Sequence, residues 1–194
     1  MGKQVIDIGV IGWDREDTYY PEDLPEDWRL AYYANEHDSV WIPGEAWLGE
    51  RWPDTAAWRE DADEAFRFVA VFDERHRALP DPGAIGRALA PLGEQLAVVI
   101  APGPVYALLF DGQPPLPGMQ HIAPGQLWSP GTEIATGAVA GRVEASVLDS
   151  PRAMRAVLEG FTAAGRDGRV FLGVNGPLSA IDDLRTLARL MGLC

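Results

Sequence analysis

The chain has 194 residues, of which 47% are hydrophobic and 23% are charged, proportions that are typical of a soluble globular protein. This length suits a single domain over residues 1–194, with a core that needs no disulfide. The formal net charge of −13 argues against nucleic acid as a partner, because its phosphates would be repelled. No apolar run approaches the ~20 residues of a membrane helix, so we expect no membrane association.

The cellular compartment is predicted from the cysteine count and the N-terminal residues. Cys194 is the only cysteine, so no internal disulfide can form. The first residues run directly into a strand pattern and lack the regions of a secretory leader. Both features predict a cytoplasmic protein.

The first half of the chain alternates between strand and helix patterns. Nearly continuous apolar runs are typical of strands covered on both faces, and apolar residues at helical spacing follow them. The predicted strands are Val5–Ile11, Ser39–Ile42, Phe66–Phe72 and Leu96–Ala101, and the predicted helices begin near Pro25, Asp54 and Asp81.

The middle of the chain is less regular. Val105–Phe110 is apolar throughout and predicts a fifth strand. Residues 112–131 are rich in proline, which disfavours helices and central strands. We therefore expect a long irregular connection there in place of a helix.

Regular patterns return in the last third. Strands are predicted at Arg142–Leu148 and Arg169–Val174. A helix is expected after the cap signal Ser150-Pro151, and Ser179 with Asp182 resembles a capping box at the start of the final helix.

Strands that alternate with helices favour an α/β fold of parallel βαβ units. About seven strands and five or six helices are predicted. Because a complete eightfold barrel typically needs ~250 residues, we expect a reduced or incomplete TIM barrel. A doubly wound open sheet is the alternative.

Several short segments carry a family resemblance. The segments are IDIGVIGW at 6–13, YYP at 19–21, LAYYA at 30–34 and SVWIP at 39–43, with weaker similarity in FRFVAVF at 66–72 and VFLGVN at 170–175. In this order they resemble the YecE-like family, also called domain of unknown function 72 (DUF72). The resemblance implies a TIM-barrel fold, but no activity, because that family has no established function.

The chain departs from the family pattern at three positions that the resemblance places in the barrel pocket. Where the family's second strand reads VEIN, the chain has Trp41 and Pro43. Where its third strand ends in lysine, the chain has Val71, and Lys3 is the only lysine present. The resemblance therefore implies that the polar groups of the family pocket are lost here.

In both architectures, ligands bind beyond the carboxyl ends of the parallel strands. That rule nominates Asp14, Asp73 and His76 as catalytic candidates, with Glu74 beside them. It nominates six residues for binding: Trp13, Glu45, Trp47, Asp111, Asp149 and Asn175. Grouped acids can bind a divalent cation or act as an acid–base pair. Helix capping and solvation are the simpler roles for each acid alone.

The histidines and tryptophans leave further alternatives open. His76 follows a strand and is a better site candidate than His37 or His121. No H-x-x-x-H or C-x-x-C spacing occurs, so we expect no zinc site. Six of the seven tryptophans precede residue 59, where they either pack in the core or present faces to a sugar, a base or a protein.

Two functions follow from these patterns. The first is a degenerate barrel that binds a small molecule or a protein partner. The second is a hydrolase-like or isomerase-like enzyme with an acidic site, with or without a metal ion, at the carboxyl ends of the strands, built from Asp14, Glu45, Asp73 and His76. No pattern indicates a cofactor or an oligomeric state.

Overall fold

The structure is a computed structural model that describes residues 4–13, 19–49, 52–111, 116–132 and 136–194. Seven parallel strands form one sheet in the order β5-β4-β3-β2-β1-β7-β6. The strands are β1 Gln4–Ile11, β2 Ser39–Ile42, β3 Arg67–Val71, β4 Leu96–Ile100, β5 Gln120–Ile122, β6 Ala140–Glu144 and β7 Gly168–Asn175.

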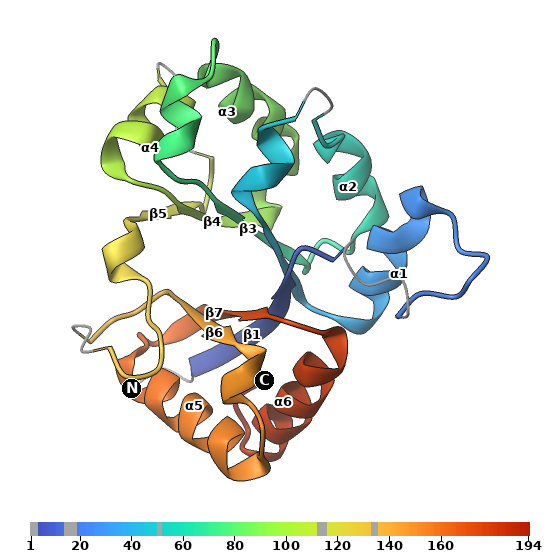
Figure 1. The fold of residues 1–194 in the computed structure, drawn as a ribbon, viewed down its shortest axis with the longest axis vertical. Coiled ribbons are helices and arrows are strands. Elements are labelled where there is room, and N and C mark those ends of the chain that lie inside the picture. Colours follow the sequence, from blue (N-terminus) through green and yellow to red (C-terminus); the bar gives the residue numbers. More distant parts are fainter. Residues whose placement is uncertain (1–3, 14–18, 50–51, 112–115, 133–135) are drawn as a thin grey trace.

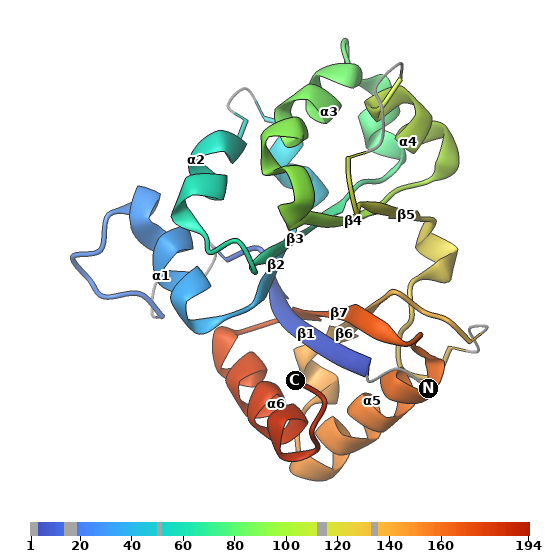
Figure 2. The same ribbon diagram turned by 180° about the vertical axis from the view of Figure 1, so that it is seen from behind.

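The sheet curves into an incomplete barrel with its helices on the outside (Figures 1 and 2). The helices are α1 Arg29–Glu36, α2 Thr55–Asp61, α3 Gly83–Leu89, α4 Gly103–Leu109, α5 Pro151–Ala164 and α6 Leu178–Leu190. This arrangement confirms the predicted α/β fold and the reduced TIM barrel, and it excludes the alternative of a doubly wound open sheet.

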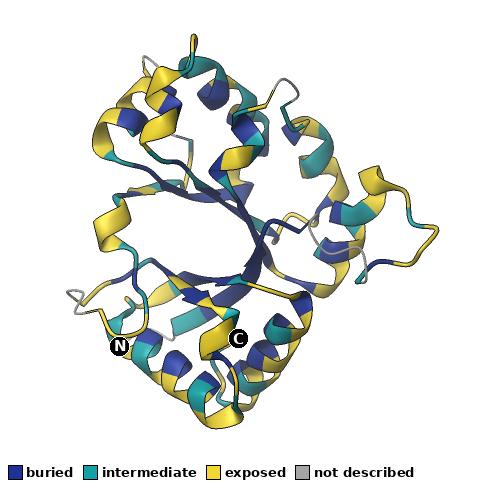
Figure 3. Cartoon of the chain, viewed as in Figure 1, coloured by how far each residue is buried: buried dark blue, intermediate teal, exposed yellow. Residues whose placement is uncertain are grey.

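The larger part of the core lies between the outer face of the strands and the helices. Ile8, Phe68 and Leu172 point outward from their strands, and they pack in one cluster with Leu158 of α5 and Ile181 of α6. Figure 3 shows the strands buried along most of their length. Alternate strand residues therefore face a dry outer layer, as in other helix-covered parallel sheets.

The gap between the two edge strands, β5 and β6, is spanned by a short segment in place of an eighth strand. A 3₁₀ turn at Pro124–Gln126 leads from β5 toward β6 (Figure 1). Trp128 then donates its backbone N–H to Ala140 O (3.0 Å), and the N–H of Arg142 donates to Trp128 O (2.8 Å). Among the described residues of this segment, Trp128 alone pairs with β6.

A second, smaller apolar cluster fills the inside of the barrel. It contains Ile11, Trp41, Val69, Val98, Ile100, Phe171 and three further buried residues, among them Ala140. Trp41 is fully buried and is the largest of these side chains. Its indole lies where Gly173 leaves space, since a Cβ at that glycine would come within 2.5 Å of the ring. Trp41 therefore fills the centre of the barrel.

Four predictions of local structure were wrong. The strand predicted over Val105–Phe110 is instead most of helix α4, which ends at Leu109 and buries Val105 and Leu109 one turn apart; Pro104 lies in its first turn, where proline is favoured. The irregular region 112–131 contains the strand β5. The strand predicted over 142–148 ends at Glu144 and continues as a 3₁₀ turn. Helix α6 begins after Pro177 without a side-chain cap, so the Ser179 capping box does not form.

Within the described part of the chain, no helix combines the length and the apolar character needed to cross a bilayer.

Candidate functional site: the mouth of the barrel

A cavity of about 400 Å³ opens at the carboxyl ends of the strands. Six of the seven strands contribute residues of their own to its lining, and β5 contributes through the segment that follows it. The lining residues are Ile11, Trp41, Pro43, Gly44, Glu45, Val71, Phe72, Asp73, Arg75, Ile100, Pro124, Leu127, Arg142 and Asn175. The cavity is therefore at the position where parallel α/β folds bind ligands.

The lower part of this cavity is apolar. Ile11, Val71, Ile100 and Leu127 line it above the buried indole of Trp41. The Nε1 atom of Trp41 has no hydrogen-bond partner among the described residues. The floor thus offers an apolar surface to a ligand, with one indole N–H donor left unpaired among the described residues.

One side of the rim carries three charged residues from the β2 and β3 loops. Arg75 donates from Nη2 to Asp73 Oδ2 (2.6 Å) and to Glu45 Oε1 (2.9 Å), and from Nε to Asp73 Oδ2 (2.9 Å). Hydrogen bonds from Arg75 hold the pKa of Asp73 below its ordinary value. Asp73 is therefore ionised near neutral pH and is a weak base.

The other side of the rim is formed by β6 and β7. Arg142 donates to Glu144 Oε1 from Nη2 (3.0 Å) and Nε (3.2 Å). Asn175 donates from Nδ2 to Glu144 Oε2 (2.6 Å). Two arginines thus stand on different sides of the mouth, each held by carboxylates.

His76 lies below the rim and has a structural role. It is fully buried, its Nδ1 accepts from the backbone N–H of Asp73 (3.2 Å), and its Nε2 lies 3.1 Å from Gly44 O. Because a carbonyl oxygen only accepts, Nε2 donates to Gly44 O, while Nδ1 also lies 3.0 Å from Asp73 O. A Cβ on Gly44 would come within 2.8 Å of the His76 ring, so the two residues are packed together.

The structure brings three of the nominated residues together at the mouth: Glu45, Asp73 and Asn175. It does not bring the other described ones there. Trp13 packs edge-on against Trp58, with ring centroids 4.7 Å apart, and Trp47 is fully buried.

The remaining acidic candidates lie elsewhere. Asp111 and Asp149 are exposed and do not line the mouth cavity. Ser150, next to Asp149, forms the helix cap that the sequence predicted at the start of α5. Asp14 lies outside the described residues. Of the acidic candidates, the rim therefore retains Glu45 and Asp73.

Sequence reasoning missed Arg75, Arg142 and Glu144 at this site. A signal for the last two was present, because residues two apart on a strand share one face, and an Arg-x-Glu pattern at the end of a strand places both side chains at the mouth. Arg75 directly precedes His76 in the chain, yet it is the arginine, and not the histidine, that lines the mouth.

The described residues contain no group of three or more histidine, cysteine, aspartate or glutamate side chains that could hold a metal ion. The rim carboxylates are directed to arginines instead. The chemistry of the mouth is thus that of ion pairs over an apolar floor.

Comparison with solved structures gives the same fold throughout. A DUF72 family protein from Thermotoga maritima superposes with a TM-score of 0.58 and 12% sequence identity, covering 97% of this chain and 100% of the other. A DUF72 family protein from Enterococcus faecalis V583, solved twice, gives TM-scores of 0.51 and 0.52 at 13% identity, covering 98–100% of this chain and 96–100% of the other. This is the DUF72 fold.

The resemblance to the YecE-like, or DUF72, family is thereby confirmed at the level of the fold. No protein-family model and no curated protein sequence matches the chain. The three positions at which the chain departs from the DUF72 sequence pattern, Trp41, Pro43 and Val71, all line the mouth cavity. The departures are thus concentrated at the candidate site.

Proposed function

We propose that this DUF72-fold chain is a binding module whose barrel mouth takes a small organic ligand. The ligand would place an apolar body on the floor formed by Ile11, Val71, Ile100 and Leu127. Its polar groups would face the ion pairs of the rim. A volume of about 400 Å³ lies within the range of about 300–1,000 Å³ that is usual for small-molecule pockets.

One observation carries this proposal. Trp41, Pro43 and Val71 replace the polar residues of the family pattern, and all three line the cavity. Apolar substitution at the bottom of a pocket, with a polar rim kept above it, favours affinity for an organic molecule over acid–base chemistry.

Binding is favoured over catalysis by the state of the polar groups. A general acid or base works best with a pKa near the operating pH. Hydrogen bonds from Arg75 lower the pKa of Asp73, and so move it further from neutral pH. His76 is buried, with both ring nitrogens bonded to the backbone. The hydrolase-like alternative would therefore have to depend on Glu45 or Glu144.

A small molecule is favoured over a protein partner at this face. The cavity is concave and is lined by short loops, whereas a protein interface needs about 800 Å² per partner with buried anchor residues. The large exposed side chains Trp28 and Tyr32 belong to the α1 region and do not line the mouth.

A ligand screen by protein-observed NMR tests the proposal. We expect compounds that combine a ring with a polar group to shift the indole Nε1–H signal of Trp41 and to raise the melting temperature. Val71→Phe, which fills the cavity, should abolish both effects. Arg77→Gln, a matched change at an exposed arginine that does not line the mouth, should leave them intact.

Two results would overturn the proposal. One is a broad screen in which no compound perturbs the Trp41 signal. The other is a set of compounds that bind equally well to the wild-type chain and to Val71→Phe.

A further inference from the structure

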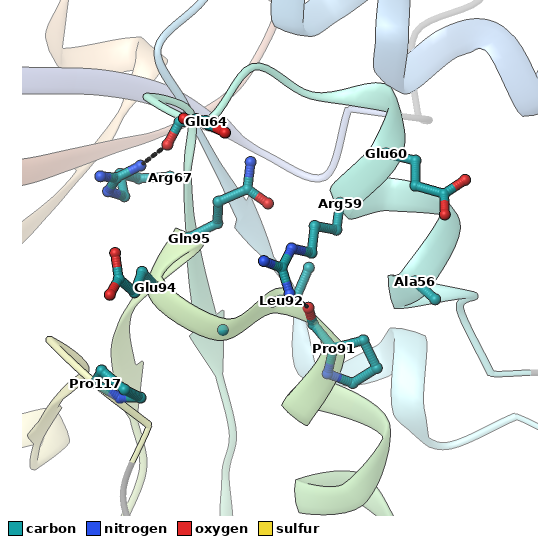
Figure 4. A pocket seen from close by; sticks show the side chains of 11 residues that line it. Ala56, Arg59, Glu60, Glu64, Arg67, Pro91, Leu92, Glu94, Gln95 and Pro117 are labelled. Atoms are coloured by element: carbon teal, nitrogen blue, oxygen red, sulfur yellow. Dashed lines mark hydrogen bonds between the residues drawn. The ribbon is translucent and has the colours of Figure 1, made fainter.

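The opposite, N-terminal end of the barrel carries two joined cavities. One, of about 460 Å³, lies against the beginnings of β3, β5 and β7, and the other, of about 940 Å³, lies between α2 and the turn Ala90–Gln95. Both are lined by Arg67, Glu94 and Pro117, and Figure 4 shows these three residues in the larger one. The two cavities therefore form one continuous depression centred on Arg67.

Arg67 is held in place by backbone carbonyls. Its Nη1 donates to Glu64 O (2.6 Å; dashed in Figure 4) and to Phe66 O (2.9 Å). Its Nε and Nη2 atoms bind no acceptor among the described residues, and it forms no ion pair there. The guanidinium is thus oriented by the main chain, with donors left over.

Arg169 is directed to the same turn. It pairs with the buried Asp7 and donates from Nη2 to Ala65 O (2.9 Å), between the two carbonyls that Arg67 binds. Burial, and after it the charge of Arg169, lowers the pKa of Arg67. Two like charges held this close repel each other, and a bound anion would offset that repulsion.

Two more arginines line the depression without a carboxylate partner. Arg166 is exposed and forms no ion pair among the described residues, and Arg59 donates from Nη1 to Pro91 O (3.0 Å). Most other described arginines pair with acids, namely Arg75, Arg77, Arg87, Arg142, Arg155, Arg169 and Arg185. In a chain with 29 acidic and 16 basic residues, arginines without partners gathered at one place need an explanation.

We infer that the N-terminal cavity is a second binding site, for a small organic ligand that carries one oxyanion group, a carboxylate or a phosphate. Arg67 and Arg166 would bind the anionic group through their unused donors, because a guanidinium presents a fork that matches such oxygens. Phe171, Ala97 and Pro117 line the same cavity and would contact the organic part.

Acidic residues at the edge of the site limit what it accepts. Glu94 and Asp167 also line the cavity, so a polyanion such as nucleic acid would meet repulsion alongside the arginines. A ligand with a single oxyanion group, in contrast, carries less negative charge for these acids to repel. Because reaction chemistry in such barrels belongs to the carboxyl end, the role of this site is binding.

Competition between anions tests this inference independently of the barrel mouth. We would titrate the full chain with inorganic phosphate and with benzoate at constant ionic strength, with chloride as the reference, and follow the melting temperature and calorimetric binding. Stabilisation by either probe above the chloride reference is expected, and the more effective probe identifies the class of oxyanion. Arg67→Gln/Arg166→Gln should weaken that binding by about tenfold or more, the effect of losing charge-assisted hydrogen bonds.

The control variant is Arg152→Gln/Arg189→Gln, which removes two exposed arginines that line neither cavity and should leave anion binding unchanged. Asn175→Ala, at the mouth, should also leave it unchanged. Arg166→Gln alone touches an exposed side chain, so it keeps the test valid if the double variant fails to fold. Equal stabilisation by chloride and both probes, or equal loss of binding in the control variant, would overturn the inference.

Discussion

The indole of Trp41 lies directly over the α-carbon of Gly173, in the space where any other residue of β7 would carry its side chain. A Cβ built on Gly173 falls 2.5 Å from Trp41 Cε2 and 2.6 Å from Cδ2, closer than carbon atoms approach without displacement. The two residues belong to β2 and β7, which are separated by β1 in the sheet. The missing side chain of Gly173 therefore leaves the space inside the incomplete barrel that the Trp41 indole fills.

Gly173→Ala should destabilise the chain by about 1–3 kcal/mol, because the added methyl group overpacks a filled core. Chemical denaturation would measure the change. In the Trp41→Phe background the smaller ring should relieve the clash, and a double-mutant cycle would then give a coupling energy of the same order. Gly125→Ala, where no heavy atom lies within 4 Å of the added Cβ, is the control; an equal loss at both glycines would contradict this packing.

His76→Leu should lower the free energy of unfolding by about 1–3 kcal/mol, the usual cost of leaving a buried polar group without its partner. The Gly44 carbonyl and the Asp73 N–H both lose their bonds to the ring. Denaturant titration measures the loss. His121→Leu, at an exposed residue of β5, should cost less. A His76→Leu variant with unchanged stability would refute the structural role.

Burial makes the stability of the chain depend on the ionisation of Asp7. Burial raises its pKa to about 6 from 3.8, although the charge of Arg169 acts in the opposite direction. The folded state therefore binds the proton more tightly than the unfolded state, so this contribution is full below about pH 4 and is lost as the pH rises through about 6. Its size is about 3 kcal/mol, from about 1.4 kcal/mol per pKa unit.

Asp7→Asn should remove this falling component from a plot of unfolding free energy against pH. Urea denaturation between about pH 4 and about pH 7 measures the slope. Asp167→Asn, at an exposed carboxylate near the same end of the barrel, should leave it unchanged. A slope that persists in Asp7→Asn would show that another group causes it.

His37 should produce the opposite slope. Burial, followed by the charge of Arg185, lowers its pKa to about 4 from 6.5, and Arg185 Nη1 lies 3.2 Å from its Nδ1. The folded state therefore disfavours the proton, so the contribution is full above about pH 6.5 and is lost as the pH falls through about 4. A histidine at the end of a helix is commonly stabilised as a cation, yet here the burial and the guanidinium of Arg185 favour the neutral ring.

His37→Gln should abolish that rising component, of about 3 kcal/mol, and should leave the Asp7 component visible on its own. The measurement is again denaturation as a function of pH. Because the two groups titrate in the same interval, the wild-type curve should be flatter than that of either variant. A wild-type curve steeper than both would contradict this assignment.

Two serine variants test where helix α6 begins. Ser150 accepts from the N–H of Ala153 (3.3 Å) at the start of α5, so Ser150→Ala should cost about 1 kcal/mol. Ser179 lies inside α6, which has no side-chain cap, and Ser179→Ala should change stability by less than about 0.5 kcal/mol. Thermal denaturation of both variants decides between the predicted and the observed start of α6.

The elements that sequence reasoning identified correctly have one dominant signal. Ser39–Ile42 and Val5–Ile11 are mostly apolar runs, the first bounded by Asp38 and Pro43 and the second by Gln4 and Gly12. Their burial could be predicted with little knowledge of the rest of the fold. Val105–Phe110 is equally apolar, but helix and strand are indistinguishable in six apolar residues. The preceding Pro102-Gly103-Pro104 was the available sign of a helix start.

The site was predicted less completely because it depends on registration between distant segments. The rule that strands end at a common mouth located Glu45, Asp73 and Asn175. It could not show that Arg75 connects the first two, or that Asn175 meets Glu144 from the neighbouring strand. His76 follows the same strand as Asp73, yet the 3₁₀ turn at Glu74–Ala78 directs its ring inward; the local sequence contains no signal for that direction.

The one-residue pairing of Trp128 with β6 also fixes where this barrel can grow. Every other neighbouring pair of strands is joined by a ladder, so inserting a unit there would break established register. Between β5 and β6, where Trp128 alone pairs with β6, a complete strand with its own helix could replace residues 123–128. This insertion would lengthen the circumference of the barrel without moving the seven existing strands. A chimera that grafts a βα unit at this point would therefore be the most direct route from the present chain to an eightfold barrel.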